Sequence, residues 1–372
     1  MNIDGKAWRT IWLEAGGRSI GVIDQTQLPH TFTTRSLTSL DQAAEAISTM
    51  VVRGAPLIGV TGAYGLMLAL QADPSDGSLA AAFTQLLATR PTAVNLQWAL
   101  ERVLARVLPL APAERALAAQ QEAGAIAEED VLMCEAIGDH GLALFQELAA
   151  RRPANRQNEP FNVLTHCNAG WLATVDWGTA LAPIYKAHRA GLKVHVWVDE
   201  TRPRNQGAAL TTWELGRHGV PHTLVVDNAG GHLMQHGEVD MVIVGADRVT
   251  RTGDVANKIG TYLKALAAHD NGVPFWVAVP SSTIDWTIRD GVAEIPIEER
   301  AATEVTVMTG RALDGTIVPV RIVPTATEAA NPAFDVTPSR LVTGLVTERG
   351  CCDATQQGLA QLFPDLAPRR SA

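Results

Sequence analysis

Short apolar runs rich in valine alternate with segments of helical periodicity from residue 161 onward. The runs cover residues 161–164, 194–198, 223–226, 241–244 and 275–279. Helical patterns separate them over residues 177–190, 210–218 and 256–269, with a shorter candidate turn of helix over 231–236. This alternation is typical of a parallel, doubly wound sheet covered by helices. It therefore predicts an α/β fold with a Rossmann-like parallel sheet.

A second, smaller domain is expected before residue 150. Residues 7–24 alternate apolar and polar side chains, which favours strands of a short antiparallel sheet. Helical periodicity follows over residues 38–50, where Ser39 or Asp41 is the candidate N-cap, and over residues 80–88, 95–108 and 112–148. The segment 151–160 is polar and contains two prolines, as linkers do. We expect a mainly α-helical N-terminal domain over residues 1–150, beginning with the short sheet, and a Rossmann-like domain over 151–372 that carries the catalytic site.

The charge and apolar patterns argue against several classes of protein. The net charge of −9 disfavours an extended nucleic-acid surface, although it leaves room for a small basic pocket. The sequence contains no run of 18 or more apolar residues, so we expect no membrane span. The N-terminus lacks the apolar core of a signal peptide. The four cysteines show no zinc-type spacing, and adjacent Cys351 and Cys352 are poor disulfide candidates. We expect a reduced, cytoplasmic compartment.

Polar and reactive side chains follow the apolar runs. In a parallel sheet the ligand lies beyond the carboxyl ends of the strands. The residues at these positions are His166-Cys167-Asn168, Asp199-Glu200-Thr201-Arg202, Asp227-Asn228, Gly245-Ala246-Asp247-Arg248 and Pro280-Ser281-Ser282-Thr283. The pattern indicates an enzyme or a ligand-binding protein without choosing a reaction.

Cys167 and Asp247 are the candidate acid–base groups. A lone cysteine is more often a buried structural thiol, but the end of a strand is a functional position. His166 is not automatically its base, because neighbouring residues need not share a face. A carboxyl group just after a buried strand can be desolvated, which raises its pKa and lets it act as an acid. The competing interpretations of Asp247 are an ion pair with Arg248 and a helix cap.

Three further positions suit a phosphorylated ligand. Arg53 precedes a glycine-containing loop and a candidate helix start at Pro56, where a guanidinium can fork onto phosphate. Asn257 and Lys258 are expected to open the helix 256–269, whose N-terminus would offer free N–H groups. Any single lysine is more often a surface residue. Gln206 could meet a substrate hydroxyl.

Five motifs together resemble the methylthioribose-1-phosphate isomerases, a family related to regulatory subunits of a eukaryotic translation initiation exchange factor. They are Arg53-Gly54-Ala55-Pro56, Thr165-His166-Cys167-Asn168-Ala169-Gly170, Asp199-Glu200-Thr201-Arg202-Pro203, Gly245-Ala246-Asp247-Arg248 and Gly253-Asp254-Val255-Ala256-Asn257-Lys258-Ile259-Gly260-Thr261. Residues 331–338 resemble the C-terminal signature of the same family. Each motif is modest by itself, but their order and spacing over roughly residues 45–352 are specific.

The resemblance implies an aldose-to-ketose isomerisation of 5-methylthioribose 1-phosphate in methionine salvage. It implies Cys167 and Asp247 as the catalytic pair, and it implies a cytoplasmic homodimer with no metal and no organic cofactor. Its substrate-binding positions correspond to Arg53, Gly54, Ala55, Arg90, Gln206, Asn257 and Lys258. The hypothesis is that Asp247 protonates the ring oxygen, a Cys167 thiolate moves the carbon proton, and the cationic residues hold the phosphate. A hydride shift stays open.

Some positions depart from the family pattern and leave the 5-substituent of the sugar open. They are Trp171, Asp176-Trp177, Asn205 and Ala229-Gly230-Gly231-His232. Trp171 could help to select the sugar, so the close alternative is a 5-deoxyribose 1-phosphate isomerase or an enzyme that accepts both sugars. A non-catalytic sugar-phosphate-binding regulator is an alternative of a different class, and a metal-dependent hydrolase is a third.

Overall fold

A seven-stranded sheet forms the centre of the computed structural model, which describes residues 1–90 and 93–367. The strands lie in the order β18-β17-β12-β9-β6-β7-β8, and all neighbouring pairs are parallel except β17 with β18. Their bounds are β6 Phe161–His166, β7 Val194–Asp199, β8 His222–Val225, β9 Met241–Val244, β12 Phe275–Ala278, β17 Gly344–Thr347 and β18 Gly350–Cys352. The predicted Rossmann-like α/β fold is confirmed.

The sheet is buried on both faces, and this explains why its strands read as continuous apolar runs. In β9, Met241 and Ile243 pack into one apolar cluster, whereas Val242 and Val244 pack into another on the opposite face. The covering helices are α6 Leu181–Arg189, α7 Thr212–Arg217, α8 Ala229–Gln235, α9 Thr261–Asp270 and α12 Gln356–Leu362. Each helix between two parallel strands returns the chain to the same edge, so the carboxyl ends of the strands meet there.

Helices dominate the first part of the chain, as predicted. Two small antiparallel sheets come first, formed by β1 Asn2–Ile3 with β2 Lys6–Ala7 and by β3 Ile11–Leu13, β4 Ile20–Ile23 and β5 Thr34–Leu37. The helices are α1 Leu40–Ser48, α2 Ala55–Ala72, α3 Asp76–Leu87, α4 Val94–Val107 and α5 Pro112–Ala150. Ser39 caps α1, as one of the two predicted caps, because its side chain accepts from the Gln42 N–H.

The apolar helix α2 is the centre of the N-terminal core. By length and composition it could cross a membrane, but 89% of it is buried inside the protein. Glycines 59, 62 and 65 let α4 and α3 approach it closely, since a Cβ at any of them would meet Asn95, Leu96 or Leu86. These glycines therefore serve helix packing.

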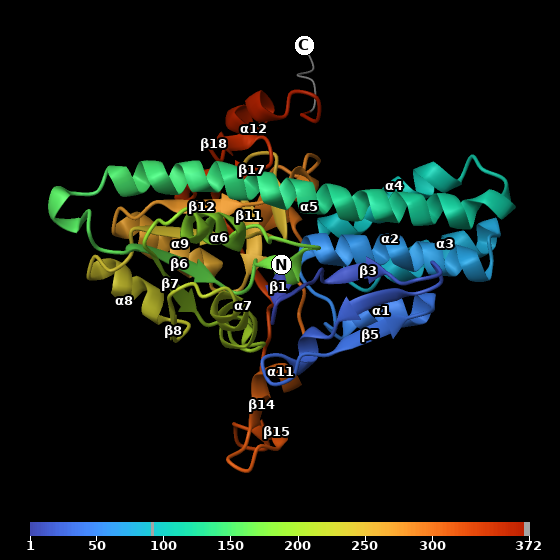
Figure 1. Ribbon diagram of the computed structural model, residues 1–372, viewed down its shortest axis with the longest axis horizontal. Coiled ribbons are helices and arrows are strands. Elements are labelled where there is room, and N and C mark those ends of the chain that lie inside the picture. Colours follow the sequence, from blue (N-terminus) through green and yellow to red (C-terminus); the bar gives the residue numbers. More distant parts are fainter. Residues whose placement is uncertain (91–92, 368–372) are drawn as a thin grey trace.

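The long helix α5 lies along both halves of the molecule (Figure 1). It packs against α2 and α4 at one end and against α6, β17 and β18 at the other. Its last residue, Ala150, coincides with the predicted domain boundary. The division into residues 1–150 and 151–372 nevertheless stays a prediction, because one helix joins both cores.

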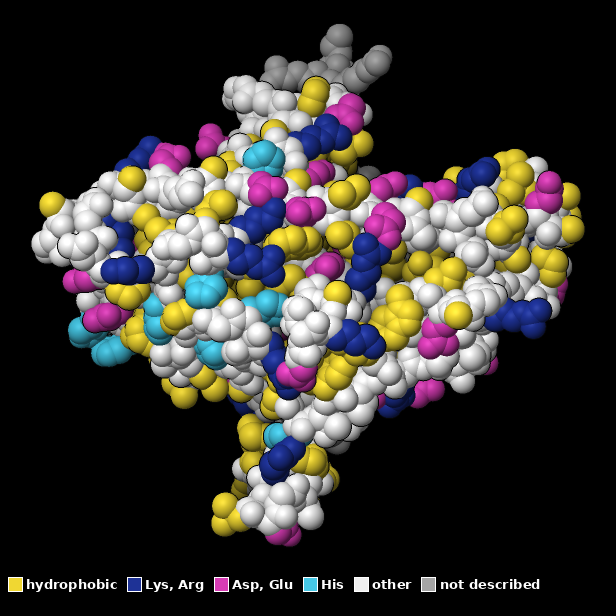
Figure 2. All heavy atoms as spheres, viewed as in Figure 1, with side chains coloured by type: hydrophobic (Ala, Val, Ile, Leu, Met, Phe, Trp, Pro, Cys, Tyr) yellow, Lys and Arg dark blue, Asp and Glu magenta, His cyan; other side chains and the backbone are white. Residues whose placement is uncertain are grey.

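A second sheet beside the main one was not predicted. It has the order β13-β10-β11-β16, with β10 Arg248–Thr250, β11 Val255–Lys258, β13 Ile284–Asp285 and β16 Phe334–Thr337. Two short helices, α10 Gly291–Glu294 and α11 Thr303–Thr306, precede a hairpin of β14 Val307–Arg311 and β15 Ile317–Arg321. The hairpin projects from the body (Figure 1). Basic and acidic side chains are interspersed over the face in Figure 2.

Candidate active site

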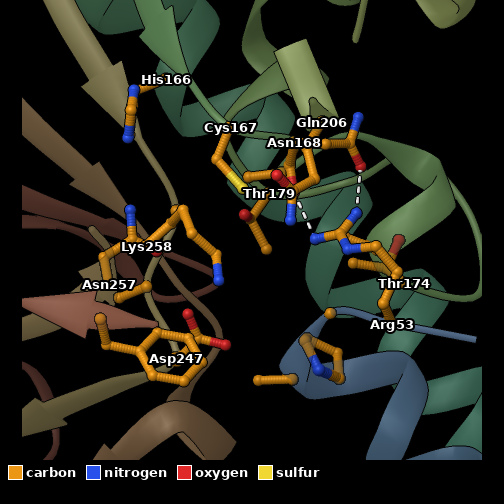
Figure 3. A pocket seen from close by; sticks show the side chains of 18 of the residues that line it. Arg53, His166, Cys167, Asn168, Thr174, Thr179, Gln206, Asp247, Asn257 and Lys258 are labelled. Carbon is orange, nitrogen blue, oxygen red and sulfur yellow. Dashed lines mark hydrogen bonds between the residues drawn. The ribbon is translucent and has the colours of Figure 1, made fainter. Parts of the chain in front are cut away.

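Cys167 and Asp247 follow two strands that pair directly in the sheet. Cys167 comes after β6 and Asp247 lies three residues after β9, while β7 continues the sheet on the far side of β6. The strand order reverses between β6 and β9, and such a reversal opens a crevice at the carboxyl edge. All nine predicted site residues line one pocket there. Figure 3 shows Cys167, Lys258 and Asp247 around the same space, with Arg53 on the side opposite Lys258.

Cys167 adopts a left-handed backbone conformation with φ of 64°. For a non-glycine residue this conformation is strained and persists only where its surroundings impose it. The Thr211 hydroxyl donates to the Cys167 carbonyl at 2.6 Å and contributes to this restraint. Burial raises the pKa of the thiol, whereas the nearby positive charges of Arg53 and Lys258 lower it. The net direction of the pKa shift is upward, so the thiol is neutral near pH 7.

Asp247 is partly buried, and this burial raises the pKa of its carboxyl group. The charges of Lys258, Arg90 and Arg53 oppose this rise. The alternative of an ion pair with Arg248 is wrong, since Arg248 pairs with Asp285 at 3.3 Å. Asp247 therefore has the environment of a carboxyl group that can hold a proton close to the working pH.

Arg53 and the start of α2 form one wall of the pocket. The Arg53 guanidinium donates to the side-chain oxygen of Asn168 at 2.6 Å and to its backbone carbonyl at 2.7 Å (Figure 3). Gly54 is the N-cap of α2, with φ of 92°, and Pro56 lies in its first turn, as predicted. Gly54 and Ala55 both line the pocket. An N-terminus without a side-chain cap beside an arginine is suited to an anion.

The prediction that Asn257 and Lys258 open a helix is wrong. Both lie in strand β11, which pairs with β10 and β16, and α9 begins only at Thr261. The side chains still reach the pocket, but the helix-dipole argument does not apply to them. The Lys258 ammonium lies 4.5 Å from the centre of the Phe334 ring, and burial lowers its pKa. The helix N-terminus at this site belongs to α2.

Two buried polar atoms at the pocket have no hydrogen-bond partner within residues 1–90 and 93–367. Arg90 is 4% exposed and uses Nε for Glu298, which leaves its Nη1 donor unpaired. Gln206 is 3% exposed, and its Oε1 acceptor is unpaired. Unpaired buried polar atoms are costly unless a ligand or water satisfies them. The site therefore offers a donor suited to an anion and an acceptor suited to a hydroxyl.

His166 fixes the geometry of the site rather than acting on Cys167. Its Nδ1 faces Asp199 at 2.5 Å, and its Nε2 faces the Ile259 carbonyl at 2.8 Å. Lys264 lies 2.9 Å from the same Asp199 oxygen. The imidazole thus joins the end of β6, which carries Cys167, to the residue that follows Lys258.

Asp199 and Glu200 are not a paired acid and base, because Glu200 accepts from the N–H groups of residues 201, 207 and 208.

Sequence reasoning missed two residues and misplaced a third. Asn168 lies between Arg53 and the side chain of Glu214, which is fully buried. The sequence did contain a signal for Glu214, since it falls four residues after buried Leu210 on the apolar helix face.

Trp171 does not line the pocket but is fully buried in the core, so its predicted role in selecting the sugar is wrong. Within residues 1–90 and 93–367, no group of three metal-ligand side chains comes together.

Comparison of this chain with known proteins shows the family to which it belongs. The model of the Initiation factor 2 subunit family matches residues 51–354. The methylthioribose-1-phosphate isomerase of Rhodospirillum centenum is 65% identical over 99% of this chain and 97% of its own length. That of Acidiphilium cryptum is 64% identical over the whole of both chains.

Solved structures agree with the sequence relatives. The crystal structure of 5-methylthioribose 1-phosphate isomerase from Pyrococcus horikoshii matches with a TM-score of 0.79, 39% identity and 96% of each chain covered. A structure described as translation initiation factor eIF-2B, subunit delta, from A. fulgidus matches with a TM-score of 0.76 and 37% identity, over 96% of this chain and all of the other. The chain belongs to the Initiation factor 2 subunit family and, within it, to the family of the methylthioribose-1-phosphate isomerases.

Proposed function

We propose that this protein is an aldose–ketose isomerase that converts 5-methylthioribose 1-phosphate to 5-methylthioribulose 1-phosphate in methionine salvage. The observation that carries the proposal is the pocket between β6 and β9. There a buried thiol and a partly buried carboxyl group share a pocket with three basic side chains, Arg53, Arg90 and Lys258. Relatives at 64–65% identity over the full length carry the same activity in their names.

The chemistry of such a substrate requires both kinds of group. Its anomeric carbon carries the phosphate, so the ring cannot open to a free aldehyde without help. We assign the proton of Asp247 to the ring oxygen, which breaks the bond between C1 and that oxygen. The thiolate form of Cys167 then takes the proton from C2 and returns it to C1, while the C2 hydroxyl proton restores Asp247. Protons and electrons balance without an external oxidant or reductant.

The positive side chains have two tasks in this mechanism. Arg53, Arg90 and Lys258, with Asn257 and the N-terminus of α2 at Gly54 and Ala55, are assigned to the phosphate. Lys258 and Arg53 also lower the pKa of Cys167 against the effect of burial. We assign the unpaired oxygen of Gln206 to a sugar hydroxyl, since a hydroxyl can donate to it.

A regulator that only binds a sugar phosphate is the competing function, because one similar structure bears the name of a translation initiation factor subunit. Binding alone does not require a desolvated thiol next to a desolvated carboxyl group, whereas proton transfer does. The catalytic pair therefore favours the isomerase.

A turnover assay with 5-methylthioribose 1-phosphate tests the proposal, with 5-deoxyribose 1-phosphate as the comparison substrate. We expect Cys167→Ser and Asp247→Asn each to lower kcat by about 10² to 10⁴-fold, the usual effect of losing a general acid or base. Cys351→Ser, which alters an exposed thiol in β18, serves as the control and should leave kcat unchanged. Near-normal turnover by Cys167→Ser, or no turnover by the unaltered protein, would contradict the assignment.

Solvent deuterium distinguishes proton transfer from a hydride shift. Turnover in D₂O should place deuterium at C1 of the product if Cys167 exchanges its proton with water.

We also propose that the enzyme is a cytoplasmic homodimer, and sedimentation of the purified chain should give twice the mass of 39.7 kDa.

A further inference from the structure

Glu214 is a buried carboxylate behind the candidate active site. It lies in α7, has 0% of its surface exposed, and does not line the pocket. An ionised side chain in such a place costs several kcal/mol unless hydrogen bonds compensate it. The role of Glu214 therefore depends on the groups that donate hydrogen bonds to it.

Four donors surround Glu214. Oε1 accepts from the Asn168 side-chain nitrogen and from the Leu172 N–H, both at 3.0 Å. Oε2 accepts from the Trp171 N–H at 2.9 Å and from the Tyr185 hydroxyl at 2.8 Å. A glutamine here would turn its own N–H₂ group towards a nitrogen donor in either orientation. The four donors therefore suit a glutamate side chain and not a glutamine, and they oppose the rise in pKa that burial causes at Glu214.

Three of these four donors belong to the loop that begins at Cys167. The carboxylate holds residues 168, 171 and 172, and a Cβ on Gly170 would lie only 1.9 Å from its Oε2. The Thr211 hydroxyl, in the π-helical turn Gly207–Thr211 just before α7, binds the Cys167 carbonyl. The turn before α7 and the first turn of α7 thus restrain the carbonyl of the strained left-handed residue and the residues that follow it.

The contact with Asn168 also reaches Arg53. An amide has one donating and one accepting end, and the Asn168 nitrogen is directed to Glu214 and Thr211. Its oxygen must then face the opposite way, where it accepts from the Arg53 guanidinium. Reversal of the amide would set N–H₂ against that guanidinium. The buried carboxylate therefore determines which atom Arg53 meets.

We propose that Glu214 is a positioning residue that holds the Cys167 loop in its strained conformation and, through Asn168, aims Arg53 at the phosphate. The kinetic part of this inference rests on the proposed isomerase function. The structural part concerns the thiol alone and can be measured without turnover.

Glu214→Gln tests the kinetic part, with Asp254→Asn as the matched control. Asp254 also accepts backbone N–H groups from two segments, at residues 291 and 339, but it lies away from the pocket. We expect Glu214→Gln to raise KM about ten-fold, the effect of weakening a charge-assisted contact, and to lower kcat. Asp254→Asn should lower only the melting temperature. Unchanged KM in Glu214→Gln, with a lowered melting temperature alone, would reduce Glu214 to a structural residue.

Alkylation of Cys167 by iodoacetamide tests the structural part. Mass spectrometry of the peptide that contains Cys167 separates it from exposed Cys351. We expect faster alkylation at pH 8 in Glu214→Gln than in the unaltered protein, because the loop is released, and no change in Asp254→Asn. Equal rates in all three would overturn the proposal, whereas absence of turnover in every protein would overturn only the isomerase function.

Two further variants keep the test decisive. If Glu214→Gln does not fold, Tyr185→Phe removes one of the four hydrogen bonds and should move KM and the alkylation rate in the same direction by a smaller factor. No change in either quantity would contradict the proposal. In a double-mutant cycle with Arg53→Lys, the two effects on KM should be less than additive, since both act through Asn168. Strict additivity would disprove the link.

Discussion

At the scale of single residues, the surroundings of Cys167 and Asp247 matter more than their identity. Burial raises the pKa of both groups, and the same three basic residues, Arg53, Arg90 and Lys258, moderate the rise at one or both. A raised carboxyl pKa suits an acid at neutral pH, whereas a raised thiol pKa keeps thiolate scarce until pH rises. The sequence identified the two residues, but it could not show how burial and nearby positive charges act against each other on their pKa values.

The raised pKa of Cys167 predicts how its reactivity depends on pH. Thiolate is the reactive form, so alkylation of Cys167 should rise with pH through a midpoint above the ordinary thiol value of 9.0. Lys258→Met removes a charge that lowers this pKa and should move the midpoint further upward. Lys193→Met, on the exposed turn before β7, should leave it unchanged. A midpoint below 9.0, or a downward shift in Lys258→Met, would contradict the described environment.

At the scale of elements, the site depends on how α2 begins. Gly54 is its N-cap and has a positive φ, and a Cβ there would lie 2.4 Å from the Ala173 carbonyl oxygen. The glycine therefore lets the start of α2 approach the segment that follows the Cys167 loop. The sequence indicated this turn, since Pro56 is frequent in the first turn of a helix, but not the segment it contacts.

Gly54→Ala should destabilise the protein by about 1–3 kcal/mol, the usual cost of a strained backbone, and raise KM because Arg53 and Ala55 flank it. Gly124→Ala is the matched control in the interior of α5, where a Cβ meets nothing within 4 Å. That change should stabilise the protein by about 0.5–1 kcal/mol through better helix propensity. Urea unfolding monitored by circular dichroism measures both, and opposite signs are expected.

At the scale of the whole molecule, α5 couples the helical core to the catalytic sheet. Asp130 lies in the middle of this helix and is fully buried. Its carboxylate accepts from the Val175 N–H at 2.7 Å, just beyond pocket residue Thr174. Burial raises its pKa from 3.8 to about 7. The folded protein therefore binds a proton that the unfolded chain releases near pH 4.

This shift predicts a stability that falls as pH rises. A folded-state pKa above the unfolded value gives a contribution that is complete below about pH 4 and is lost as pH increases through about 7. A shift of about 3 units corresponds to at most about 4 kcal/mol. Asp130→Asn should remove this dependence and be more stable than the unaltered protein at pH 8.

Unfolding midpoints at pH 5 and pH 8 measure the effect. Asp139→Asn, which removes an exposed partner of Lys186 on the same helix, should leave the pH dependence as it was. An Asp130→Asn variant whose stability falls between pH 5 and pH 8 as steeply as that of the unaltered protein would place the responsible group elsewhere.

The sequence by itself determined the fold class and most of the elements. Continuous apolar runs separated by helical segments specify strands buried on both faces, and local signals placed the Ser39 cap and the start of α2 at Pro56. The sequence also supplied the nine pocket residues, partly from strand ends and partly from the family resemblance. These features depend on short segments whose patterns survive without knowledge of distant contacts.

Only the tertiary structure decided how the elements meet. The predicted helix over residues 256–269 wrongly included part of strand β11. Asn257 and Lys258 are extended because β11 pairs with both β10 and β16, and these two partner strands lie far apart from each other in the chain. Glu214 and Asn168 acquired their roles through a hydrogen bond that spans 46 residues. The reversal of strand order between β6 and β9 brought Cys167 and Asp247 to one crevice. Such pairings depend on long-range contacts and on the pKa shifts that burial causes, and no local pattern encodes either.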